Sequence, residues 1–89
     1  MAYVVKTFET TYTPNLVVKT ETYRTRNEAE YRFQCRVWDI LAAFGKLDTS
    51  AAYMVMRQAR ARLHGVINEN SCVDVSNTGF RVALEESRP

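Results

Sequence analysis

The feature that most constrains this chain is the stretch from Thr25 to Gly45, TRNEAEYRFQCRVWDILAAFG, which predicts one long helix. At about 100° per residue, one side of this helix carries apolar residues at the spacing of a core-facing stripe. The stripe consists of Ala29, Phe33, Val37, Ile40, Leu41 and Phe44. We expect this side of the helix to pack against a sheet.

The same helix is apolar on a second side, where Tyr31, Cys35, Trp38 and Ala42 gather. Two interpretations are open. The side either packs against another helix as core or, with Arg32 or Arg36 beside it, forms an interface hot spot. A homodimer would use such a patch equally well. Four residues of this helix are therefore candidate partner-binding residues: Tyr31, Trp38, Arg32 and Arg36.

Four strands flank the helical part of the chain. Residues 3–12 and 16–25 are rich in Val, Thr and aromatics around Thr13-Pro14-Asn15, which predicts a β-hairpin. Residues 72–75 and 80–84, joined by the turn-forming residues 76–79, predict a second hairpin. Residues 85–89 are polar, and we expect them to form a frayed tail.

A second helix is predicted after Gly45, with Asp48 or Thr49 as its N-cap. Its apolar stripe continues to Ile67, so we expect it to pass through Gly65 and end near Asn68; if Gly65 ends it, the helix is one turn shorter. The order is then ββααββ. This order predicts an α+β fold in which two hairpins form an antiparallel sheet, two helices cover one face, and the other face is open.

Length and composition indicate a single globular domain over residues 1–89, since a chain of 89 residues has room for one small core. Apolar residues make up 46% and charged residues 25%, which is ordinary for a globular protein. No apolar run reaches the roughly 18 residues that a membrane span needs. We therefore expect a cytoplasmic protein whose two cysteines are reduced and packed.

The sequence offers little for catalysis. It has only three glycines, and no glycine-rich phosphate-binding loop is present. Two cysteines and the single histidine, His64, cannot complete a zinc set without carboxylates. Cys35 lies in mid-helix, away from the helix N-terminus or base that would activate a thiol. We expect no enzymatic activity, no cofactor and no metal.

The second helix carries a basic face formed by Tyr53, Arg57, Arg60 and His64. No acidic residue lies between Asp48 and Glu69, so positive charge is concentrated here although the net charge is only +2. One interpretation is a solvated face whose arginines suit the negative end of the helix. The other is a docking face for an acidic partner, either protein or nucleic acid.

A small, slightly basic domain that enters its helix through Tyr23-Arg24-Thr25-Arg26-Asn27-Glu28-Ala29-Glu30 resembles the small inhibitor proteins of bacteriophages and mobile elements, including anti-CRISPR proteins. The resemblance implies stoichiometric binding that blocks a surface of a host defence or nucleic-acid-processing complex. We therefore expect a viral protein-binding module acting in the host cytoplasm, and as the alternative a small nucleic-acid-binding protein that uses the basic face.

Overall fold

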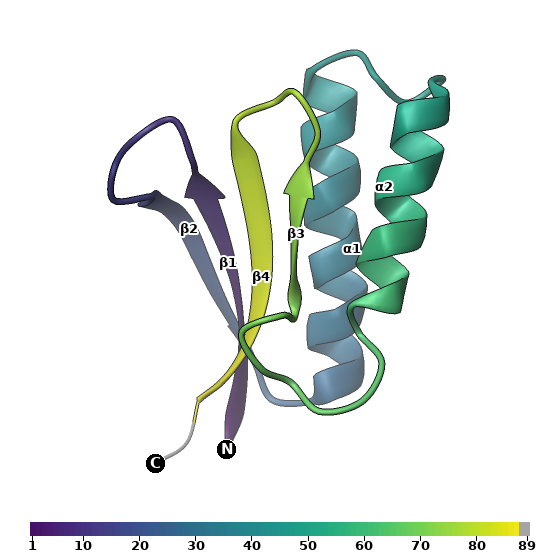
Figure 1. Cartoon of the computed structure of the whole chain (residues 1–89). Coiled ribbons are helices and arrows are strands. Elements are labelled where there is room, and N and C mark those ends of the chain that lie inside the picture. Colours follow the sequence, from purple (N-terminus) through teal and green to yellow (C-terminus); the bar gives the residue numbers. More distant parts are fainter. Residues whose placement is uncertain (88–89) are drawn as a thin grey trace.

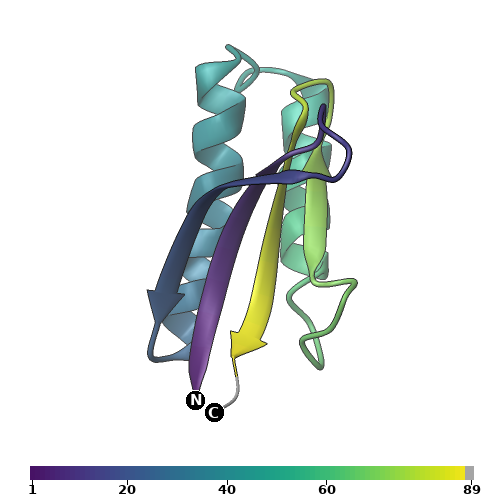
Figure 2. The same cartoon turned by 90° about the vertical axis from the view of Figure 1, so that its left-hand side faces the viewer.

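The computed structural model describes residues 1–87 and contains six elements. They are β1 (Ala2–Glu9), β2 (Leu16–Tyr23), α1 (Arg26–Ala43), α2 (Ser50–Ala61), β3 (Cys72–Val75) and β4 (Phe80–Ser87). The strands form one antiparallel sheet in the order β2-β1-β4-β3, and both helices lie on the same side of it (Figures 1 and 2). The predicted α+β fold with ββααββ order is confirmed.

The centre of the sheet is the pair formed by the first and last strands. Their register runs from Ala2 opposite Ser87 to Glu9 opposite Phe80. Residues 85–87 therefore belong to β4, and the prediction of a frayed tail is wrong for them because β1 supplies backbone partners along their whole length. Residues 88–89 of that predicted tail lie outside the described residues.

One hydrophobic core fills the space between the sheet and the helices. Odd-numbered Val5 of β1 points into it, whereas Val4 and Phe8 lie on the open face, since neighbouring side chains alternate across a strand. The core residues buried to 4% exposure or less are Val5, Ala29, Phe33, Val37, Leu41, Ala52, Val55, Ala59, Val73, Val75, Val82 and Leu84.

The predicted core stripe of the first helix holds along most of its length. Four of its residues are fully buried, and Ile40 packs at the margin of the core. Phe44 is the exception, with 46% of its surface exposed. It is the C-cap of α1, and its ring meets Phe80 edge-on at a centroid distance of 6.0 Å. Phe44 therefore lies at the margin of the core, where it packs against β4 and is only partly covered.

Both helices begin at a threonine cap. The Thr25 hydroxyl accepts a hydrogen bond from the backbone N–H of Glu28, and the Thr49 hydroxyl accepts one from Ala52. Thr49 is therefore the N-cap of α2 rather than Asp48. After α1 the backbone turns at Gly45, whose φ of 66° is the left-handed conformation that commonly follows a helix.

The predicted end of the second helix near Asn68 is wrong, because α2 ends at Ala61. Gly65 has a φ of 79°, which is incompatible with helix continuation. The turn is held by Arg26 at the start of α1, whose Nη2 donates to the carbonyls of Leu63 at 2.8 Å and Gly65 at 2.7 Å. Leu63 stays buried. The apolar stripe thus continues past the helix as a packed turn.

The open face of the sheet carries two ion pairs between neighbouring strands. Lys6 of β1 contacts Glu85 of β4 at 2.9 Å, and Arg81 of β4 contacts Asp74 of β3 at 2.7 Å. Figure 2 shows this face uncovered by any helix. The charged side chains of this face therefore pair with one another across neighbouring strands.

Candidate functional site

The aromatic side of α1 and the basic face of α2 meet along one line on the surface. There, two adjoining hollows of about 260 and 250 Å³ open between the helices. Trp38 of α1 and Met56 of α2 line both hollows. We call this feature the inter-helix groove and define it by Tyr31, Gln34, Cys35, Trp38, Asp39, Tyr53, Met56 and Arg60.

The aromatic residues of the groove are exposed rather than core. Tyr31 has 63%, Trp38 51% and Tyr53 65% of its surface open to solvent. Met56 and Cys35 are half-buried beneath them. Helix α2 therefore covers only part of the second apolar side of α1, and three large aromatic side chains remain available on neighbouring positions of the two helices.

Arg36, a candidate partner-binding residue, lies on the opposite flank of α1 and is engaged within the fold. Its Nε donates to Glu21 of β2 at 2.7 Å, and its Nη1 donates to Asp39 at 2.7 Å. The hydrogen bonds from Arg36 lower the pKa of Glu21 from its ordinary value, and those same contacts raise the pKa of Arg36. Arg36 thus stabilises the contact between helix and sheet and does not line the groove.

Arg32 lies beside the groove without lining it. Its guanidinium carbon is 5.7 Å from the centre of the Tyr31 ring, within the range of a cation–π contact. The side chain is exposed. Arg32 therefore adds positive charge next to the groove.

The arginines of the described residues fall into an ion-paired group and an unpaired group, and the two arginines of α2 belong to the unpaired group. Arg26, Arg36 and Arg81 each bind a carboxylate. Within residues 1–87, by contrast, Arg57 and Arg60 have no hydrogen bond or ion pair, and both are exposed. Arg60 lines the groove, whereas Arg57 lies almost one turn earlier on the solvent side of α2. The basic face thus holds uncompensated charge at one margin of the groove.

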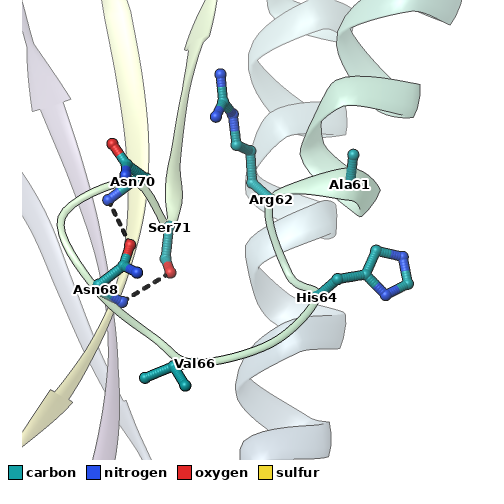
Figure 3. A pocket seen from close by; sticks show the side chains of 7 residues that line it. All are labelled: Ala61, Arg62, His64, Val66, Asn68, Asn70 and Ser71. Atoms are coloured by element: carbon teal, nitrogen blue, oxygen red, sulfur yellow. Dashed lines mark hydrogen bonds between the residues drawn. The ribbon is translucent and has the colours of Figure 1, made fainter.

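His64 is separated from this arrangement because α2 ends before it. It lies at the margin of a different hollow of about 150 Å³, and Figure 3 shows its ring pointing away from that hollow. The polar groups there bond to one another: the Asn68 N–H donates to the Ser71 hydroxyl at 3.0 Å, and the Asn70 N–H donates to Asn68 Oδ1 at 2.8 Å. This loop stabilises its own turn.

The two cysteines are free and lie on opposite sides of the molecule. Cys35 lines the groove, whereas Cys72 of β3 stands opposite Ala83 on the open face of the sheet. Over residues 1–87, no group of three or more His, Cys, Asp or Glu side chains is placed to hold a metal ion. None of the helices in that range has the length and apolar character needed to cross a membrane.

Sequence reasoning missed the role of Met56, which counts as a core residue in the apolar stripe of the second helix. It is half-buried at the edge of that stripe and forms the floor shared by both hollows. Its position three residues after Tyr53 and four before Arg60 is the signal that links it to the basic face.

Comparison of the chain with protein-family models, curated proteins and solved structures finds no significant match.

Proposed function

We propose that this chain is a non-catalytic protein-binding module that docks a partner in the inter-helix groove. The observation that carries the proposal is the joining of two features in one place. Exposed Tyr31, Trp38 and Tyr53 surround two hollows, and the unpaired Arg60 stands at their edge.

The chemistry of the groove is that of a protein interface. Trp, Tyr, Met and Arg are the residue types enriched where proteins bind one another, and anchors of this kind commonly lie in pockets that water leaves on binding. A small folded domain gains little from exposing Trp38 and Tyr53 next to each other, since exposed apolar surface favours unwanted association. A docking role accounts for their exposure.

The partner is a protein with acidic side chains around its contact surface, because Arg57 and Arg60 lack carboxylate partners of their own. The resemblance of the hairpin-to-helix segment to small phage inhibitors supports a specific form of this proposal. In that form the module is an anti-CRISPR-like inhibitor, and stoichiometric binding blocks a host defence or nucleic-acid-processing complex.

Nucleic-acid binding is the second candidate, because the same unpaired arginines suit phosphates. Arg57, Arg60 and Arg62 are exposed on α2 and its C-cap, with no acidic residue between them. Such binding would weaken steeply as salt rises, because phosphate contacts release counterions. An interface centred on Trp38 and Tyr53 would keep much of its affinity in the same salt, since apolar burial is not screened.

The two free thiols allow a direct test. The tagged protein is recovered from an extract of its source cell with whatever it binds, and the complex is treated with iodoacetamide. We expect the partner to slow alkylation of Cys35, in the groove, and to leave Cys72 as reactive as in the free protein. Each molecule thus carries its own control.

If Cys35 in a purified protein complex were alkylated as fast as in the free protein, docking in the groove would be contradicted. Recovery of nucleic acid alone, lost after nuclease treatment, would support the second candidate instead. A homodimer would also protect Cys35, and sedimentation of the pure protein separates that case.

A further inference from the structure

One inference about what the groove recognises follows from the structure and rests on the proposed function. We infer that its occupant is an acidic amphipathic helix of a partner protein, lying along α1 and α2 as a third helix. The inference follows from the spacing of the hollows, the scarcity of backbone partners in the groove and the charge at its edge.

The two hollows follow each other along the groove, on either side of Trp38 and Met56. The α1 lining of one centres on Cys35, and that of the other lies between Trp38 and Leu41. At the rise of an α-helix, these centres are roughly 6 Å apart along α1. Side chains at positions i and i+4 of a docked helix have this spacing, so one apolar anchor enters each hollow.

Backbone chemistry distinguishes a helix from an extended segment. A strand laid in the groove would bury backbone N–H and C=O groups that need partners. The hollow lined by Tyr31 and Cys35 is mostly apolar, whereas the polar groups of the other hollow belong to side chains such as Arg60 and do not form a row of backbone partners. The amide of the groove, Gln34, already donates to the carbonyl of Glu30 at 3.3 Å, and Asp39 is bound to Arg36. A helix satisfies its own backbone and needs only apolar walls.

The positive charge of α2 predicts acidic residues on the flank of the docked helix that faces it. Arg60 lines the groove and Arg57 stands beside it, both without a partner among the described residues. Glutamates or aspartates on that flank would form charge-assisted hydrogen bonds with these guanidinium groups. On the α1 side the carboxylate of Asp39 is already bound by Arg36. The preference for negative charge on the docked helix therefore comes from the arginines of α2.

The inference is tested by selection from a displayed library of helical 18-residue peptides. The scaffold is fixed with helix-forming residues, and the positions of one face and both of its flanks are randomised. Selection uses the intact protein, and Trp38→Ala serves as the counter-target. We expect enriched peptides to carry apolar residues at i and i+4 and acidic residues on one flank.

Binding of the selected peptides is then measured directly, because Trp38 is the only tryptophan in the chain and reports on the groove by its fluorescence. We expect a blue shift on binding and a loss of affinity of about tenfold or more for Arg57→Glu with Arg60→Glu. Insertion of a proline in mid-peptide should abolish binding, since it breaks a helix.

Several outcomes would overturn the inference. These are failure to enrich any peptide over the counter-target, enrichment of proline-containing or basic peptides, and binding that leaves the Trp38 spectrum unchanged. If the partner from the cell extract still protects Cys35 in any of those cases, docking in the groove stands and only the helical nature of the occupant is lost. Self-association that shifts the Trp38 spectrum in the absence of peptide would make a second copy the occupant.

Discussion

Arg36 and Glu21 form a two-pronged ion pair that ties the middle of α1 to the edge strand β2. The Nε and Nη2 groups of Arg36 donate to the two carboxylate oxygens of Glu21, and Tyr23 donates to the same carboxylate at 3.1 Å. Both charged side chains are largely buried, with 17% and 14% of their surface exposed. Strand β2 has a neighbour on one side only, so this pair is its main polar anchor to the helix layer.

The Arg36–Glu21 pair should make stability depend on pH. The hydrogen bonds from Arg36 hold the pKa of Glu21 below its ordinary value of 4.5 in the folded protein. A lowered folded-state pKa contributes stability above 4.5, and this contribution is lost as pH falls through the folded-state pKa. Urea unfolding of Glu21→Gln should show about 1–2 kcal/mol lower stability at neutral pH. Its stability should also fall less on acidification than that of the parent.

The matched control for that change is Glu69→Gln, because the Glu69 side chain is exposed and without a partner among the described residues. Glu69→Gln should leave both the stability at neutral pH and its acid dependence close to those of the parent. Equal acid dependence in Glu21→Gln and the parent would show that the ion pair does not govern it.

Arg26 should be as important for the turn after α2 as for its own helix. It donates to the carbonyls of Leu63 and Gly65 and pairs with Glu30 at 2.6 Å. Arg26→Met removes these donors while keeping an apolar stem, and we expect a loss of about 1.5–3 kcal/mol, the range for hydrogen bonds from a charged group. Thermal unfolding measures the loss. Arg24→Met, at an exposed arginine without a partner within residues 1–87, should change stability by under about 0.5 kcal/mol.

Trp38→Ala should strongly weaken partner binding in a protein that remains folded. Half of the side chain is exposed, so the core keeps its packing, whereas the wall common to both hollows is lost. Truncation of a central aromatic anchor typically costs 2 kcal/mol or more, about thirtyfold in affinity. The control is Tyr12→Ala on the β1–β2 loop, where the ring is 55% exposed and far from the helices in sequence. Equal binding by the two variants would remove Trp38 from the interface.

Arg57→Glu with Arg60→Glu should weaken association while leaving the fold unchanged. Both residues are exposed on α2 and unpaired within residues 1–87, so their replacement should alter stability by under about 0.5 kcal/mol each. Against an acidic partner, attraction becomes repulsion, which mainly slows association. Surface plasmon resonance at low and high salt measures the effect, and Arg24→Glu serves as a single charge reversal outside α2. Unchanged association at low salt would mean that the arginines are only solvated.

The sequence predicted the order of the elements because the local signals agree with the fold. Thr25 and Thr49 mark both helix starts, and the buried stripe of α1 has the spacing that its packing requires. The predicted end of α2 was wrong because apolar spacing alone does not show where the helical backbone ends. Leu63 keeps the apolar spacing of a helix although its backbone has left it, and Arg26, distant in sequence, holds the turn.

The sequence predicted residues that line the groove but not that they lie together. Trp38 and Tyr53 stood out as candidates on separate helices, but their meeting depends on how α1 and α2 cross. The contact made by Arg36 could not be predicted from the sequence either. From the sequence Arg36 is a candidate partner-binding residue, and only the position of β2 brings Glu21 within reach to bind it.

The pairing of β1 with β4 has a consequence for how this chain reaches its folded state. The two strands at the centre of the sheet are the first and the last in the sequence, and Figure 2 shows both described ends of the chain on the same side of the molecule. Contacts between such distant segments carry a large loop-closure entropy and slow the search for the native state. During synthesis, β1 must wait with an unpaired edge until β4 has emerged from the ribosome. The central strand pair of the sheet can therefore form only after residues 80–87 have been synthesised.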